Sequence, residues 1–314
     1  MKIAAVTPCY PPGSRVGSWL STHECLRVLL AAGHDVVANP MMVDNPNEYV
    51  LDGIRVVPGA VRMEEVIGGA DVVISHLGDP GHAHRTAIAL GIPSVRMVHG
   101  LIGQDALRQL AAYPPALVVF NSESSAATAR HRCPHIVVNP IFDRQDFATT
   151  PGELVTQVNQ SDPKGGQMFQ KLVRFMPDVN FLAVRGGYGK QRDMVGRNVE
   201  TLAPTQDMRG DVYSRTRVLL IPSKAETWGM VGVEAMCSGI PVMASPTPGL
   251  VESLGDAGIF VDANNFKGWM SELRRLLDPV EWAAASARSL ARVAELDPYE
   301  GAVRFVKAIE GLVE

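Results

Sequence analysis

The sequence contains no long apolar segment, and this absence excludes one large class of proteins. No stretch of its 314 residues approaches the roughly 20 consecutive apolar residues that a membrane-spanning helix needs. The first apolar run is cut short by Thr7 and Pro8, so it predicts a buried first strand and not a signal peptide. We therefore expect a cytoplasmic protein without a transmembrane segment.

Paired cysteines and an excess of one charge are also missing. The four cysteines, Cys9, Cys25, Cys133 and Cys237, form no Cys-x-x-Cys pair, which predicts reduced thiols and no zinc site. The net charge is -4, with 11 basic and 13 acidic residues up to Phe147 and 18 and 20 after it. Neither half is a basic module, which argues against general nucleic-acid binding.

Short apolar segments alternate with helical ones throughout the chain. Strands are expected at 2–6, 34–38, 70–75, 94–98, 116–120 and 135–139, and again at 153–158, 180–185, 217–221, 240–244 and 258–261. Helices are expected at 18–32, with Ser18 as a cap and Gly33 as the stop, and at 279–295 and 298–313. This alternation predicts an α/β protein with open parallel sheets covered by helices on both faces. Polar, turn-forming residues at 143–152 predict an interdomain linker.

Glu226 and Glu234 lie eight positions apart in a predicted strand–loop–helix–strand unit whose helix stops at Gly239. Ligands of parallel sheets gather at the carboxyl ends of the strands, where the next helix presents free N–H groups. If all eight steps were helical, the two carboxylates would be about 12 Å apart along the axis. We therefore expect them to hold different parts of one long ligand.

This arrangement resembles the Glu-x7-Glu motif of retaining GT-B glycosyltransferases of the glycosyltransferase family 4 type. The similarity continues in Gly239–Val242, Pro248–Glu252 and Gly258–Val261. It implies the GT-B fold, in which two Rossmann-like doubly wound parallel-sheet domains face a cleft. The implied division is an acceptor-side domain at 1–148, a nucleotide-sugar-binding domain at 149–296, and a final helix at 297–314 that packs back on the first domain.

The family roles of the two glutamates fall on Glu226 and Glu234. The resemblance implies that Glu226 binds hydroxyls of the donor sugar in a catalytic role and that Glu234 binds the nucleotide ribose. Donor contacts are also implied for Thr227, Trp228, Gly229, Met230 and Val231, where the helix start would stabilise charge on the diphosphate. The alternative is a pair of solvated carboxylates on a helix face.

A long loop with Gly13, Arg15 and Gly17 follows the first strand. A dinucleotide fold would instead have Gly-x-Gly-x-x-Gly in a tight turn, so an NAD site is not expected. The loop resembles the glycine-bearing loop that faces the donor diphosphate in the family, although the usual adjacent glycine pair is missing. We assign these three residues to donor binding, with an ordinary surface loop as the alternative.

Two histidines end predicted strands of the first half. His99 is followed by Gly100 and resembles the strand-ending His-Gly of the family beside the donor sugar, which implies a catalytic role. His76 lies where the family has histidines on the acceptor side. The alternative for either residue is a buried polar group whose hydrogen bonds are satisfied within the protein.

The second half opens with Lys164-Gly165, which matches the Lys-Gly of the family. The resemblance implies that Lys164 contacts the diphosphate and takes part in catalysis; the alternative is a solvated lysine at a helix start. The arginine that the family usually has five residues earlier is Asn159 here, which we still assign to donor binding. Arg185 or Arg15 could supply the missing positive charge.

The resemblance implies a retaining hexosyltransferase that moves a sugar from a nucleotide diphosphate sugar to an acceptor hydroxyl. A UDP- or GDP-sugar is the expected donor, and the base is expected to contact residues 201–209. No cofactor and no metal are implied, and the sequence contains no Asp-x-Asp motif. The alternatives are a catalytically degenerate sugar-nucleotide-binding protein and a GT-B-type sugar-nucleotide epimerase. The acceptor stays unidentified.

Overall fold

The computed structural model describes residues 1–12, 16–42, 46–76, 81–187 and 189–313, which fall into two compact units. Unit 1 comprises Met1–Ile141 and Pro298–Glu314, and unit 2 comprises Phe142–Asp297. The division falls before the predicted boundary at 148 because Phe142 is buried in a core cluster of unit 2 and Phe147 packs against that cluster.

Unit 1 is built on an eight-stranded sheet. Its strands are β1 (Lys2–Thr7), β2 (Asp35–Pro40), β3 (Tyr49–Leu51), β4 (Ile54–Val56), β5 (Val72–His76), β6 (Ser94–Val98), β7 (Leu117–Phe120) and β8 (His135–Val137). Their order is β3-β4-β2-β1-β5-β6-β7-β8, and only β3 pairs antiparallel. The direction of winding reverses between β1 and β5, so this sheet is doubly wound.

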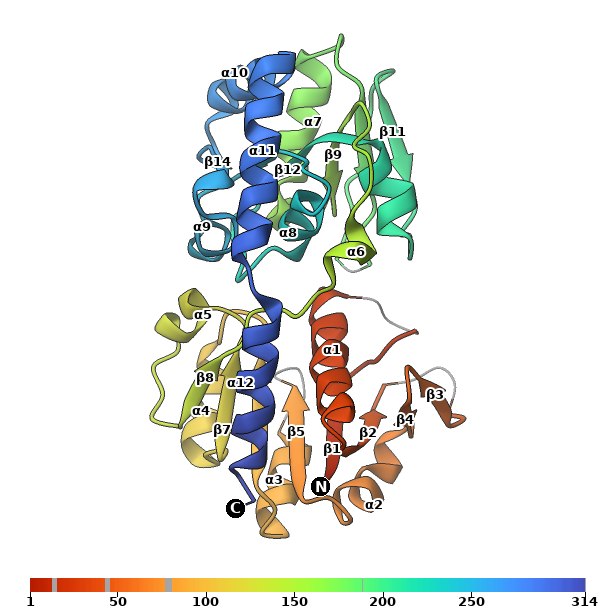
Figure 1. The fold of residues 1–314 in the computed structure, drawn as a ribbon, viewed down its shortest axis with the longest axis vertical. Helices are drawn as coiled ribbons and strands as arrows, with labels where there is room; N and C mark the ends of the chain where they lie inside the picture. Colours follow the sequence, from red (N-terminus) through yellow and green to blue (C-terminus); the bar gives the residue numbers. More distant parts are fainter. Residues whose placement is uncertain (13–15, 43–45, 77–80, 188, 314) are drawn as a thin grey trace. The chain divides into compact units, whose positions relative to one another are not determined.

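Six α-helices accompany this sheet among the described residues. They are α1 (Gly17–Ala31), α2 (Met63–Ile67), α3 (His82–Ala89), α4 (Gln104–Ala112), α5 (Glu123–Thr128) and α12 (Pro298–Glu310). The last helix lies beside α1 (Figure 1), and its Phe305 and Ile309 are fully buried in the same core cluster as Leu26 of α1. The C-terminal helix therefore belongs to unit 1 even though unit 2 precedes it in the chain.

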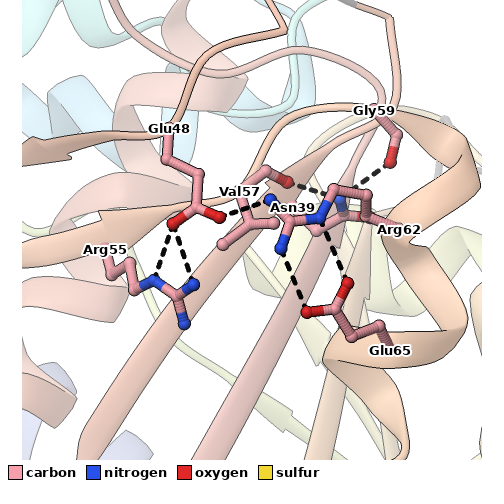
Figure 2. A network of polar contacts seen from close by, with 7 residues as sticks. All are labelled: Asn39, Glu48, Arg55, Val57, Gly59, Arg62 and Glu65. Carbon is pink, nitrogen blue, oxygen red and sulfur yellow. Dashed lines mark hydrogen bonds and ion pairs between the residues drawn. The ribbon is translucent and has the colours of Figure 1, made fainter.

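A polar network holds the outer edge of the unit 1 sheet (Figure 2). Asn39 at the end of β2 is fully buried and donates from Nδ2 to the carbonyls of Val57 and Gly59 at 2.6 and 3.1 Å. At the surface, Arg62 pairs with both Glu48 and Glu65, and Arg55 also pairs with Glu48. Exposed ion pairs of this kind stabilise little individually, so the edge is joined to the sheet mainly by the pairing of β2 with β4 and by the buried amide of Asn39.

Unit 2 is built on a six-stranded parallel sheet. Its strands are β9 (Leu154–Val158), β10 (Phe181–Val184), β11 (Val199–Leu202), β12 (Thr216–Ile221), β13 (Val242–Ala244) and β14 (Ile259–Phe260). Their order is β11-β10-β9-β12-β13-β14. This is the order of a doubly wound dinucleotide-type sheet, in which β9 and β12 flank the topological switch point.

Helices and short turns connect these strands. The α-helices are α6 (Arg144–Phe147), α7 (Gly166–Phe175), α8 (Met230–Met236), α9 (Pro248–Leu254), α10 (Phe266–Leu276) and α11 (Pro279–Glu295). The turns are η2 (Asp162–Lys164), η3 (Met208–Val212), η4 (Tyr213–Arg215) and η5 (Gly255–Ala257). Fully buried side chains, among them Trp269, Phe169 and Leu219, fill clusters of the unit core.

The eleven predicted strands are confirmed, and no end differs from its predicted position by more than two residues. The strands β3, β4 and β11 were not predicted. The prediction that Ser18 caps the helix is wrong, because α1 begins at Gly17 and its N-cap residue is Val16, which makes no capping hydrogen bond through its side chain. Within the described parts of the chain, we find no helix with the length and apolar character needed to cross a bilayer.

Candidate functional site

The best-defined polar site of unit 2 lies at the carboxyl ends of β9 and β12, the two strands at the switch point. Lys164 ends the turn η2 that follows β9, and Glu226 lies in the loop that follows β12. The Lys164 ammonium pairs with Glu226 Oε1, to which Ser223 Oγ also donates at 3.2 Å. Both side chains are mostly enclosed, with exposed fractions of 21% for Lys164 and 14% for Glu226. The structure thus brings together two of the three predicted catalytic residues.

Gly165 explains why glycine follows the lysine. It adopts a left-handed backbone conformation with φ of 83°, which glycine tolerates without strain. A Cβ at this position would lie 2.3 Å from the carbonyl oxygen of Pro222, the residue that follows β12. The Lys-Gly pair therefore lets the turn after β9 touch the end of β12, which positions Lys164 near Glu226.

Gly249 plays the corresponding part on the other side of Glu226. A Cβ on Gly249, in the first turn of α9, would lie 2.5 Å from the carbonyl oxygen of Glu226 and 2.4 Å from the carbonyl carbon of Thr227. Only glycine allows α9 to approach the Glu226–Thr227 backbone this closely. The Pro248–Glu252 motif is thus a packing partner of the loop that carries Glu226.

Glu234 lies in α8 and is held by a tyrosine that the sequence analysis did not single out. The hydroxyl of Tyr213, in the turn η4 before β12, donates to Glu234 Oε2. Burial raises the pKa of Glu234 to about 7, and the hydrogen bond from Tyr213 opposes this shift. Burial, together with the nearby Glu234 carboxylate, also raises the pKa of Tyr213 well above its usual value, so the phenol keeps its proton.

Asn159 differs from the expectation that it faces a ligand. Its backbone is left-handed with φ of 66°, and the residue is 6% exposed. Its Oδ1 accepts from the backbone N–H of Ser161 at 3.1 Å and from Gln191 Nε2 at 3.0 Å. Gln191 Oε1 in turn accepts from the backbone N–H groups of Gln160 and Gly186. The amide of Asn159 therefore organises the loops after β9 and β10 and is turned back into the protein.

The remaining donor-binding predictions are placed as follows. Arg185, at the end of β10, pairs with the exposed Asp193. Gly17 begins α1, whereas Gly13 and Arg15 lie outside the described residues. Thr227, Met230 and Val231 are half-buried around the start of α8, which follows Gly229 without a side-chain cap. Trp228 is only 3% exposed and its side chain packs in the core of unit 2. The side chain therefore anchors the loop that carries Glu226 to this core.

In unit 1, His76 and His99 form a stacked pair. His76 ends β5 and His99 follows β6; their rings are 5.2 Å apart, and His76 Nε2 lies 3.1 Å from His99 Nδ1. Ser21 Oγ lies 3.1 Å from His99 Nε2, and Trp19 packs on the other ring. Burial lowers the pKa of His99 to about 4. Burial, with His99 and Arg96 nearby, lowers that of His76 to about 2. Both imidazoles are therefore neutral hydrogen-bonding groups at pH 7.

A metal centre has no ligand set in the parts of the chain that the structure describes. No group of three or more His, Cys, Asp or Glu side chains comes together there. The polar groups of the two clusters are instead an ammonium, two carboxylates, hydroxyls and neutral imidazoles. Such groups can hold hydroxyls and phosphates through hydrogen bonds and charge.

Several partners in these clusters could not be found by motif. Tyr213, Ser223, Gln191 and Ser21 contact predicted residues that are 21, 3, 32 and 78 positions away in sequence. Ser223 lies only three positions before Glu226, so its hydroxyl was a readable signal. The other three depend on contacts between elements that no local pattern reports.

The fold defines the class of protein. Anabaena HepE in complex with UDP-glucose matches 99% of this chain and 100% of its own with a TM-score of 0.82 and 16% identity. Sucrose-phosphate synthase from Thermosynechococcus elongatus matches 99% of this chain and 98% of its own with a TM-score of 0.79 and 16% identity. Identities this low establish the fold alone, and that fold is GT-B, as predicted.

The second unit can be placed more narrowly. Residues 167–279 match the family described as glycosyl transferases group 1, so this unit carries a glycosyl transferases group 1 domain. D-inositol 3-phosphate glycosyltransferase of Rhodococcus opacus is 33% identical over 94 residues, which are 28% of this chain and 21% of the relative. O-antigen chain mannosyltransferase B of Escherichia coli is 34% identical over 82 residues, 26% of this chain and 22% of the relative. The chain thus spans about a fifth of the length of these curated relatives.

Proposed function

We propose that this protein is a retaining hexosyltransferase of the glycosyltransferase family 4 type. It takes a sugar from a nucleotide diphosphate sugar and gives it to an acceptor hydroxyl. The observation that carries this proposal is the meeting of Lys164 and Glu226 at the switch point of the unit 2 sheet. Doubly wound sheets bind nucleotides at that point, and the two residues have the chemistry that a sugar diphosphate needs.

The chemical step breaks the bond between the anomeric carbon of the sugar and the diphosphate oxygen. The acceptor oxygen bonds to that carbon, the diphosphate leaves with the electron pair, and the acceptor proton is released. Negative charge therefore grows on the diphosphate. An ammonium already held in place stabilises that charge without reorganising, and Lys164 has three donors, so it can keep Glu226 while it binds phosphate.

Glu226 and Glu234 then hold the two ends of the donor. Glu226 Oε1 is occupied by Lys164 and Ser223, whereas Oε2 has no hydrogen-bond partner among the described residues. That oxygen is suited to accept from sugar hydroxyls. Glu234 would accept from the ribose, with the base near residues 201–209. Both glutamates act by orienting the donor and transfer no proton.

The donor is proposed to be a UDP- or GDP-sugar. HepE, which shares the fold, is described in complex with UDP-glucose, and this supports a UDP-sugar as the first donor to test. We propose that His99 lies near the donor sugar and His76 on the acceptor side. Neutral imidazoles at these positions suit hydroxyl recognition. No cofactor or metal enters the proposed step.

The test begins with donor binding and ends with the product. Purified protein is screened by thermal shift against UDP- and GDP-sugars, because a donor at 100 times its dissociation constant stabilises the fold by about 2.7 kcal/mol. The best donor is then offered acceptor pools, and the anomeric configuration of the product is read by NMR. An inverted product would contradict retention. Binding without transfer or hydrolysis would favour the alternative, a catalytically degenerate sugar-nucleotide-binding protein. This alternative is tested because Asn159 stands in place of the family's arginine and is hydrogen-bonded within the protein.

A further inference from the structure

We propose that Tyr213 positions Glu234 for recognition of the ribose and thereby makes the site selective for ribonucleotides over deoxyribonucleotides. This inference rests on the proposed function, since it concerns the same nucleotide site. It assigns a role to a residue that neither the motif nor the comparisons identify.

Tyr213 is held rigidly from all sides. The residue is fully buried, and it belongs to the core cluster that also contains Val212, Met236 and Cys237. Its ring meets that of Phe147 edge-on, with centroids 6.3 Å apart and planes at 75°. Because its ring is packed in this way, Tyr213 keeps its hydroxyl in one place. The Glu234 carboxylate therefore adopts the orientation that accepts from this hydroxyl.

The direction of the hydrogen bond is set by the protonation of Tyr213. Above the pKa of Glu234, which is about 7, the carboxylate can only accept, and the buried phenol keeps its proton, so Tyr213 donates to Glu234 Oε2. The other oxygen, Oε1, has no hydrogen-bond partner among the described residues. The hydrogen bond therefore fixes the rotation of the carboxylate. It leaves Oε2 bonded to Tyr213 and Oε1 available to a ligand.

The place of Tyr213 in the chain links this carboxylate to the predicted base-binding segment. Tyr213 begins η4 immediately after η3, whose start is capped by Asp207 Oδ1 accepting from Gly210 N at 2.7 Å. Residues 201–209 are where we expect the nucleobase. The same short segment thus carries the base contacts at one end and the residue that orients the ribose carboxylate at the other.

A ribose offers neighbouring 2′ and 3′ hydroxyls, and a carboxylate with one fixed orientation can accept from them. A carboxylate free to rotate spends part of its time pointing elsewhere and loses that contact. Selectivity for the ribose should then decline while contacts to base and diphosphate persist. This outcome separates a positioning role from a general contribution to folding, which would weaken all nucleotides equally.

The experiment compares Tyr213→Phe with the wild type by calorimetric titration. The probes are UDP, GDP and their 2′-deoxy and 3′-deoxy forms. We expect the wild type to bind its preferred ribonucleotide at least tenfold more tightly than one deoxy form, which is the value of one charge-assisted hydrogen bond. In Tyr213→Phe this ratio should fall several-fold, mainly through weaker binding of the ribonucleotide. Tyr299→Phe, at an exposed position of unit 1, is the matched control and should keep the ratio.

Glu234→Gln closes the test. Tyr213 would donate to the oxygen of the amide, so the neutral NH2 group would face the ribose and the charged acceptor would be lost. Discrimination should therefore fall strongly, and adding Tyr213→Phe should change the ratio little further. An unchanged ratio in a folded Tyr213→Phe protein overturns the proposal, as does equal weakening of all probes. If Tyr213→Phe fails to fold, a retained ratio in Glu234→Gln overturns it. A wild type that binds nucleotides without discrimination overturns this inference alone, whereas no nucleotide binding overturns the proposed function.

Discussion

Lys164 and Glu226 form an ion pair although they are 62 positions apart in the sequence. The pair joins the turn after β9 to the loop after β12, the two strands where the winding of the unit 2 sheet reverses. Gly165 permits this approach because any side chain there would meet the backbone of Pro222. The pair is enclosed on most sides, so its charges interact more strongly than they would in water.

The first prediction concerns Lys164 as the cation that stabilises the leaving diphosphate. Lys164→Ala should lower turnover with the natural donor by about 10²–10³, the usual effect of losing one well-placed electrostatic donor. Lys171→Ala removes an exposed lysine of α7 and serves as the control. Steady-state kinetics of both variants decide the point. Near-normal turnover in Lys164→Ala would remove this residue from the mechanism.

The second prediction follows from the backbone of Asn159. From the sequence, Asn159→Arg would restore the charge that the family carries and partly rescue Lys164→Ala. The structure predicts the opposite, because the side chain is buried and its left-handed backbone suits Asn better than Arg. We expect Asn159→Arg to lose about 1–3 kcal/mol of unfolding free energy and to give no rescue.

Urea denaturation and the kinetics of the double variant measure these two effects. Asn159→Gly, which relieves the backbone strain but removes the amide, separates the two causes. Recovery of turnover in the Lys164→Ala, Asn159→Arg double variant would show that the side chain reaches the phosphates after all.

The third prediction is a pH dependence of stability that comes from Glu234. Its pKa in the folded protein is about 7, above the ordinary value of 4.5, so the native state binds more protons than the unfolded chain between these values. The contribution of Glu234 to the unfolding free energy should therefore fall as the pH rises from about 4.5 to 7 and level off beyond. The buried histidines His76 and His99, whose pKa values are lowered, contribute in the opposite direction, so this contribution is read from the comparison with a variant. Tyr213 and Cys237 are the titratable neighbours, and burial raises the pKa of both, so neither titrates in this window.

Urea titrations of the wild type and Glu234→Gln at several pH values isolate this contribution. The unfolding free energy of the wild type minus that of Glu234→Gln should decline as the pH rises from about 4.5 to 7. A difference that is flat, or that grows with pH, would show that Glu234 titrates near its ordinary value.

The fourth prediction concerns metals. Treatment with EDTA followed by desalting should leave transfer activity unchanged, because the described residues gather no ligand set and the proposed step uses an ammonium. Activity is compared before treatment, after it, and after addition of magnesium or manganese. Loss on chelation with recovery on adding a metal would refute the metal-independent mechanism.

The sequence predicted most of the fold because its strands are buried on both faces and read as short apolar runs. The strands β3 and β11 lie at the edges of their sheets, and β4 is the short strand next to β3. The edge strands carry exposed residues such as Val50 and Glu200. Their patterns are weaker for that reason. The helix α12 was predicted from the sequence, and its packing on the first domain came from the family resemblance, whereas its contact with α1 was not predicted.

The site was predictable where a motif is local. Lys164-Gly165 and Glu226 could be read directly, because turn geometry and loop position depend on neighbouring residues. The role of Asn159 could not be read, since it depends on a backbone conformation and on Gln191, which is 32 residues away. Tyr213 was missed for the same reason, although a tyrosine just before a buried strand is visible in the sequence.

The most direct test of the central claim is acceptor-dependent release of nucleoside diphosphate from a nucleotide sugar. The purified chain is incubated with UDP- and GDP-sugars, with and without acceptor pools, and the released diphosphate is quantified alongside Glu226→Ala. The account predicts that one donor is consumed, faster with acceptor, and that Glu226→Ala loses most of this activity. Consumption of no donor under any condition, or equal rates in the wild type and Glu226→Ala, would contradict it.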